Sequence, residues 1–213
     1  MKRLLFLCAL AGLGFNAGNA RADSANNDWD GGYKQVATRR SGFMLGLTTG
    51  LAVGRAYGYP NELAKLDVAR YERNTAFALG SASRLWLGGA LTDWFVFGFG
   101  LEGISLKRDK IIAAGGAYIF HVEGYPLFYR GGVFRDLSVF GDFGAGGMKI
   151  TGRGRNDADG GLLSVIGLGA GWDPVRFWHF NFGPAVEYTH VWSQTLTADT
   201  VSLEARLTFV GGP

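Results

Sequence analysis

The sequence contains a single cysteine and no long apolar segment free of glycine and charge. Cys8 is the only cysteine among 213 residues, and it lies in the short apolar run 4–13. No other segment approaches the roughly 20 apolar residues that a helix needs to cross a bilayer. These absences argue against a disulfide-stapled fold and against a bundle of transmembrane helices.

The N-terminus has the three parts of a secretory signal. Lys2 and Arg3 precede the apolar run, and residues 20–22 form a small-x-small cleavage site. The run is too short to span a bilayer as a helix. We therefore expect residues 1–22 to be a signal peptide that is cleaved, which directs the chain out of the cytoplasm.

The remaining chain carries no excess of either charge. Removing residues 1–22 takes away three basic residues and no acidic ones, so 21 basic residues become 18, equal to the 18 acidic residues. Balanced charge gives no indication of nucleic-acid binding, and the only cysteine is removed as well. Residues 23–40 show little periodicity and are expected to form a flexible periplasmic lead-in to one domain over 41–210.

From residue 41 onwards, short segments alternate between bulky apolar and small or charged residues. Strand side chains alternate between faces, so segment 95–102 has two unlike sides: Phe95, Phe97, Phe99 and Leu101 on one, Gly98, Gly100 and Glu102 on the other. The side with the charge is also the glycine side, which cannot form a well-packed core but can line a narrow lumen. The bulky side would then face lipid.

Eight such strands are predicted, at about 42–55, 75–91, 94–107, 111–124, 137–151, 161–172, 176–192 and 200–210. Tilted strands of this length cross a bilayer, so the expected fold is all-β, an eight-stranded antiparallel up-and-down transmembrane barrel. The longest polar connection, 56–74, is expected outside the cell. The connection 125–136 is long for a periplasmic turn.

Because side chains alternate between the two faces of a strand, six charged residues are expected on the lumen side: Arg84, Glu102, Glu123, Glu187, Glu204 and Arg206. Pairing of neighbouring strands predicts Arg84 opposite Glu102, and Glu187 beside Arg206 and close to Glu204. Side chains nearly fill the interior of an eight-stranded barrel, so a structural plug is favoured. A conducting or gated path is the alternative.

Five aromatic residues lie near strand ends or on outward positions, where the membrane meets water: Trp94, Tyr118, Trp178, Tyr188 and Trp192. Tyrosine and tryptophan favour this boundary because each ring has an apolar body and a polar tip.

Catalytic groups are sparse. His190, Ser193 and Glu204 could suggest a lipid-hydrolysing triad, but His190 and Ser193 are three residues apart and Glu204 is expected to face inward. His121 and Glu123 share the lumen face without a third metal ligand. We therefore expect no catalytic residue, no cofactor and no metal.

The signal, the alternating strands, the inward glutamate and arginine residues and the terminal strand 202–209 resemble small eight-stranded outer-membrane β-barrel proteins. The transmembrane domain of outer-membrane protein A is the nearest type. The resemblance implies a monomer in the outer membrane, in contact with outer-membrane lipids, lipopolysaccharide and the assembly machinery. Such proteins usually end on an aromatic residue, whereas here Phe209 is followed by four more residues.

Three functions remain open. The first is a non-enzymatic barrel with a narrow or plugged lumen, in an envelope-structural, adhesive or small-solute pore role. The second is a barrel enzyme that modifies lipid A. The third is a soluble periplasmic lipocalin-like binder of an apolar ligand, which requires the Phe95, Phe97 and Phe99 face to lie inside and Glu102 outside.

Overall fold

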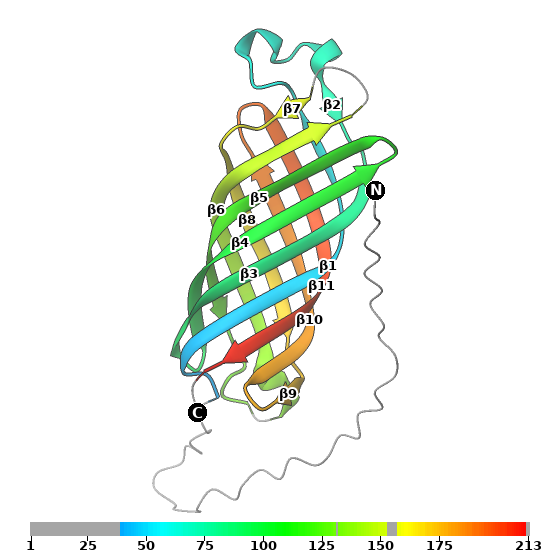
Figure 1. Cartoon of the computed structure of the whole chain (residues 1–213). Helices are drawn as coiled ribbons and strands as arrows, with labels where there is room; N and C mark the ends of the chain where they lie inside the picture. The colour runs from blue at the N-terminus through cyan, green and yellow to red at the C-terminus, as the bar shows by residue number, and fades with distance from the viewer. Residues whose placement is uncertain (1–38, 131, 153–156, 212–213) are drawn as a thin grey trace, which may run out of the picture. The chain divides into compact units, whose positions relative to one another are not determined.

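The computed structural model describes residues 39–130, 132–152 and 157–211 (Figure 1). The expected signal peptide, 1–22, and nearly all of the expected lead-in, 23–40, lie outside the described residues. Everything described belongs to one compact unit, Val36–Pro213. Within the described ranges, no helix is both long enough and apolar enough to cross a membrane.

Eight long strands form a closed antiparallel barrel, which confirms the predicted fold class. Each pairs with the next, and the last pairs with the first, so these eight strands form a closed ring. The strands are β1 (Gly42–Gly58), β3 (Ala78–Thr92), β4 (Phe95–Arg108), β5 (Ile111–Gly124), β6 (Leu137–Thr151), β8 (Leu163–Trp172), β10 (Phe180–Trp192) and β11 (Leu196–Val210).

Short elements extend or connect these strands. They are the strands β2 (Arg73–Asn74), β7 (Ala158–Asp159) and β9 (Val175–Phe177), and the 3-10 helices η1 (Leu63–Lys65), η2 (Ala69–Tyr71) and η3 (Val133–Asp136). The strand predicted at 176–192 is in fact two strands, β9 and β10, which pair as a hairpin. Trp178 makes the turn with a φ of 55°. The aromatic alternation runs straight through this turn, so periodicity alone could not reveal it.

The barrel has two unlike ends. The lower end carries the first and last described residues, Arg39 and Gly211, and the connections 93–94, 125–136 and 173–179. The upper end carries the connections 59–77, 109–110, 152–162 and 193–195. Figure 1 shows β2 and β7 at the upper end and β9 at the lower end.

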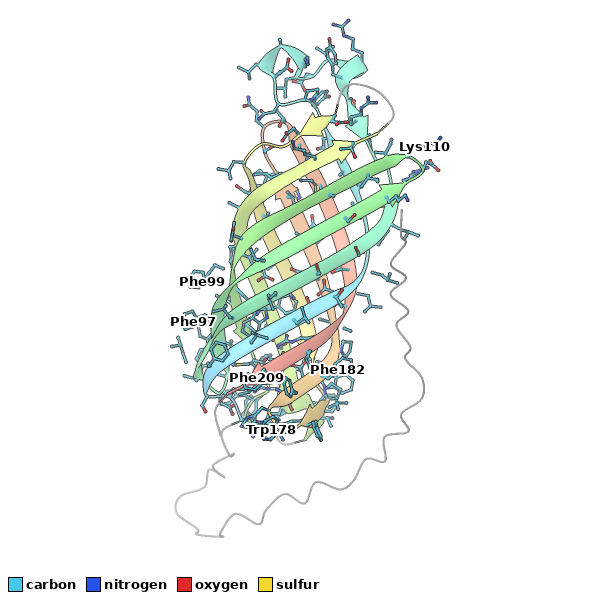
Figure 2. The ribbon with its side chains drawn as sticks, in the orientation of Figure 1. Phe97, Phe99, Lys110, Trp178, Phe182 and Phe209 are labelled. Atoms are coloured by element: carbon cyan, nitrogen blue, oxygen red, sulfur yellow. The ribbon has the colours of Figure 1, made fainter. Side chains whose placement is uncertain are left out.

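The bulky faces of the strands point away from the lumen. Leu51 is 77% exposed, Phe99 is 64% exposed, and Figure 2 shows Phe97 and Phe99 outside the wall. Glu102 on the same strand as Phe99 is buried in the lumen. The lipocalin-like alternative required the opposite arrangement of β4, and the structure therefore overturns it.

Candidate functional site: the filled lumen and the outward surface

Apolar side chains fill the upper half of the lumen. Alanine side chains pack beside larger aliphatic side chains, and all eight long strands contribute buried residues to this layer. The main members are Ala52, Ala56, Ala82, Ile104, Leu106, Ala117, Ile119, Met148, Ile150, Leu163, Val165, Val191 and Leu196. Mixing small and large side chains lets the layers interlock, so this half has the character of a packed core.

Backbone hydrogen bonds between connections close the upper mouth. The Tyr59 amide donates to the Thr195 carbonyl (2.8 Å), and the Asp159 amide donates to the Tyr59 carbonyl (3.1 Å). The Thr195 hydroxyl donates to the Asp159 carbonyl (2.8 Å). The Gly161 amide donates to the Asp159 carboxylate (2.9 Å), which lowers the pKa of that carboxyl. Three separate connections therefore form one cover.

A small cavity lies within the apolar half. It measures about 20 Å³, and its walls include Ile104, Met148, Leu163 and Val191. Space of this size holds about one water molecule, so it forms no path along the barrel. Glu102 lines the cavity, and its Oε2 atom has no hydrogen-bond partner among the described residues.

Below this apolar layer, one buried guanidinium binds three carboxylates. Arg84 contacts Asp142, Glu187 (2.8 Å) and Glu204 (3.8 Å). Its guanidinium carbon lies 4.4 Å from the centre of the Phe140 ring. These groups come from four strands, β3, β6, β10 and β11, so the cluster ties the walls of the barrel together across the lumen.

Of the two predicted pairings, the structure confirms the register of the first and contradicts that of the second. Arg84 does lie opposite Glu102 in the β3–β4 register. However, no ion pair is found between the two, and Glu102 instead accepts a hydrogen bond from Thr189 (3.1 Å). Glu187 lies opposite Ser202 and binds Arg84, so it is not beside Arg206. The reason is the short 193–195 turn, which shifts the register between β10 and β11 relative to the longer loop predicted.

A stacked pair of rings links the middle and lower parts of the lumen. His121 Nδ1 lies 2.7 Å from Asp142, and its Nε2 lies 3.5 Å from Glu123. The His121 ring stacks on Trp86 with centroids 4.5 Å apart. Trp86 in turn covers Gly46, where a Cβ would come within 2.2 Å of the indole nitrogen. Glycine is required at this close approach.

The second arginine cluster lies nearer the lower end. Arg206 binds both oxygens of Glu123 (2.5 and 2.8 Å) and approaches Asp173 (3.4 Å). Its Nη2 also lies 3.2 Å from the Tyr125 hydroxyl. Burial raises the pKa of Asp173 to about 6, although Arg206 opposes that shift. Burial also raises the pKa of the Tyr125 phenol.

The connection 125–136 folds across the lower mouth, which accounts for its length. Arg40 stacks on the ring of Tyr125, 3.4 Å from its centre, and binds Asp136. Arg135 binds Asp93, and the Arg40 amide donates to Asp93 (3.0 Å). Residues 39 and 40, at the end of the expected lead-in, therefore contact the barrel.

Sequence reasoning missed several members of these clusters. The residues are Arg40, Asp93, Arg135, Asp136, Asp142 and Asp173. Most lie in connections, where strand parity says nothing about direction. Asp142 lies in β6, where alternation is weak in the sequence, but its parity with the buried Phe140 is a signal that could have found it.

The five predicted interfacial aromatics are all exposed on the outer surface, at different heights. Trp94 lies in the β3–β4 turn and Trp178 in the β9–β10 turn, both at the lower end, where Figure 2 shows Trp178. Trp192 ends β10 at the upper end, and Tyr188 lies four residues before it. Tyr118 lies at the middle of β5.

The residues of the hypothetical triad are not brought together. Ser193 Oγ accepts the amides of Thr195 (3.2 Å) and Leu196 (3.1 Å) within the turn, whereas Glu204 is buried in the lumen. His190 instead places its Nδ1 2.8 Å from Asp199 on the outer surface. In the described part of the chain, no group of three or more His, Cys, Asp or Glu side chains could hold a metal ion.

No protein-family model matches the chain, and no curated protein matches it. The barrel is similar to Ail, the attachment invasion locus protein of Yersinia pestis, with a TM-score of 0.52 and 13% identity, covering 80% of this chain and 100% of that one. It is also similar to Neisserial surface protein A, with a TM-score of 0.52 and 11% identity, covering 80% and 98%. With a closed wall of eight strands, an apolar outer surface and buried charge clusters in the lumen, the chain has the fold of these small eight-stranded β-barrels.

Proposed function

We propose that this protein is a non-enzymatic outer-membrane barrel with a plugged lumen, which presents its upper connections as a contact surface in an adhesive role. The observation that carries this proposal is the filling of the lumen at successive heights. The 59–77, 157–160 and 193–195 segments cover the upper mouth, aliphatic side chains fill the next layer, and arginine clusters and the 125–136 connection fill the rest.

The arginine clusters support a plug that stays in place. Arg84 and Arg206 are each buried and bind carboxylates from other strands. Removing a buried charge from its partners costs several kcal/mol, because the partner is left unpaired in a medium of low dielectric. Opening a path would separate several such pairs together, and no bound group in the lumen is needed to hold them.

The connection 59–77 supports the choice of contact surface. It is the longest connection, it contains η1 and η2, and it stands above the upper mouth (Figure 1). Leu63 in η1 is exposed, and Glu62 and Lys65 on either side of it in the chain form an ion pair (2.6 Å). Long loops face outward in barrels of this type, with short turns and the chain ends in the periplasm. The outward wall contacts outer-membrane lipids, including lipopolysaccharide, and the barrel works as a monomer.

Bilayer recording tests the plug. The full chain is folded into planar bilayers, with its boiling-dependent gel shift as proof of a closed barrel. We expect no discrete current steps. Regular steps from the folded form would contradict the plug and favour the small-solute pore.

Exchange of the connection 59–77 for a short Gly-Ser turn tests the contact surface. We expect the gel shift to persist while attachment of expressing cells to host cells or matrix is lost. Changing only Asp109 and Lys110, in the short β4–β5 turn at the same end, is the control and should leave attachment unchanged. Equal attachment by all variants would remove the adhesive role.

A further inference from the structure

Three charged or titratable side chains form one row on the outward surface near the upper end. His190 on β10 lies directly opposite Asp199 on β11, and Asp199 lies directly opposite Arg55 on β1. Figure 1 shows these three strands side by side. The row belongs to neither arginine cluster of the lumen, and the plug does not use it.

Asp199 accepts contacts from three directions. Tyr188 donates its hydroxyl proton to Oδ1 (2.8 Å), and His190 Nδ1 lies 2.8 Å from the same oxygen. Arg55 donates from Nε to Oδ2 (3.3 Å). The carboxylate therefore fixes the imidazole and the guanidinium in neighbouring positions, as a supporting residue does for groups that bind a ligand.

The fixed groups keep donors to spare. Among the described residues, neither Nη atom of Arg55 has a hydrogen-bond partner, and its side chain is 58% exposed. His190 uses only Nδ1, and its side chain is 34% exposed. A guanidinium with two free amino groups matches the paired oxygens of a phosphate. With Nδ1 donating to Asp199, the Nε2 atom of His190 donates to a third oxygen in the imidazolium form.

The surroundings place this row at the height of lipid headgroups. The next outward row towards the barrel centre contains Val53, Tyr188 and Val201, whereas the next row towards the upper end contains Tyr57 and Trp192. Trp192 stacks on His190 with ring centroids 5.2 Å apart. Aromatic residues of this kind mark the boundary between hydrocarbon and headgroups.

We propose that Arg55 and His190, held by Asp199, bind the phosphate of a lipid in the outer leaflet. The inference rests on the proposed outward orientation of the upper end. A charged residue facing the lipid is costly unless its charge reaches water or an opposite charge. Asp199 contacts Arg55 through Nε alone, and a lipid phosphate at this depth pairs with the two remaining amino groups. The lipid is favoured over free phosphate because apolar wall residues lie directly beneath the row.

Lipid retention in native mass spectrometry tests the site. The full chain is folded in detergent with either bis-phosphorylated lipid A or the same lipid after removal of its phosphates. We expect the intact chain to retain the phosphorylated form about tenfold more, since a charge-assisted contact contributes that much. The double variant Arg55→Gln/His190→Gln should lose this preference while keeping its gel shift.

A matched variant controls for general attraction to basic residues. Lys107 and Lys110 are exposed at the same end of the barrel, on the β4–β5 hairpin, and Lys110 is seen at its tip in Figure 2. We expect Lys107→Gln/Lys110→Gln to retain the phosphorylated lipid. Loss of the preference in this variant, with retention in the Arg55/His190 variant, would overturn the proposal.

Two further outcomes would also overturn it. Equal retention of both lipids by the intact chain would mean that Arg55 only extends its charge into water. The second outcome is that millimolar inorganic phosphate displaces the lipid and binds equally well when no lipid is present. This result would assign the site to free phosphate. A current in the bilayer recording would defeat the plug but leave this lipid preference intact, so the two proposals can fail separately.

Discussion

The two halves of the lumen are filled by different chemistry within one barrel. The upper half is aliphatic and is covered by backbone hydrogen bonds between connections. The lower half holds arginine clusters, a stacked Trp86–His121 pair and a folded connection. In both halves every second side chain of a strand points into the lumen. A side chain that points inward is therefore not necessarily polar. The upper half behaves as a packed core, and the lower half as a network of mutually dependent charges.

Breaking the lower network should have the largest effect. Arg206→Met leaves Glu123 and Asp173 buried without their partner, so we expect the free energy of unfolding to fall by about 3–5 kcal/mol. Urea unfolding in lipid vesicles, followed by the gel shift, measures it. Lys149→Met removes an exposed ion pair with Asp159 and should cost less than about 1 kcal/mol. Similar losses in both variants would contradict a special role for buried pairing.

A truncation in the upper half should cost somewhat less. Leu196→Ala leaves a cavity in the aliphatic layer, and we expect a loss of about 3 kcal/mol. Leu203→Ala lies on the same strand but on the outward face and should cost clearly less, because lipid can fill the space. The same urea titration compares them. Equal losses would mean that the upper lumen is not packed as a core.

The lower half should also respond to pH. Burial raises the pKa of Asp173 to about 6 in the folded barrel, from 3.8. At Asp173 the folded state then binds more protons than the unfolded state between these values, so the contribution of this group to the free energy of unfolding falls as pH rises from 4 to 6, by about 2 kcal/mol. Asp173→Asn should remove this part of the slope. An unchanged slope, measured by unfolding at each pH, would show that Asp173 does not cause it.

Adding a side chain should destabilise the barrel at Gly46, which faces the lumen, and not at a glycine on the outward wall. Gly46→Ala forces the buried Trp86 to shift, and we expect a loss of about 1–2 kcal/mol. Gly103→Ala is the control, since a Cβ there meets nothing closer than 3.5 Å and faces outward. Tryptophan fluorescence during unfolding reports both. A neutral Gly46→Ala would mean that the Trp86–His121 stack tolerates displacement.

The strands could be predicted because alternation is a local property. Segment 95–102 shows both faces, and β4 has the predicted orientation. Pairing across the lumen could not be predicted in the same way. Arg84 and Glu187 are 103 residues apart, and Arg206 and Glu123 are 83 apart. Which charges meet depends on the register of every strand between them, and the short 193–195 turn alone changed the expected partner of Glu187.

Alternation along the chain was enough to predict the number of long strands, the outward face of most of them and the inward direction of six charged residues, because side-chain direction follows from a period of two. The folded barrel adds three features: the lumen is divided into an aliphatic and a charged half, 125–136 covers the lower mouth, and Arg55, Asp199 and His190 form one row. Closure of the barrel brings the first strand, β1, beside the last strand, β11. Residues so far apart in the sequence leave no local signal of this contact.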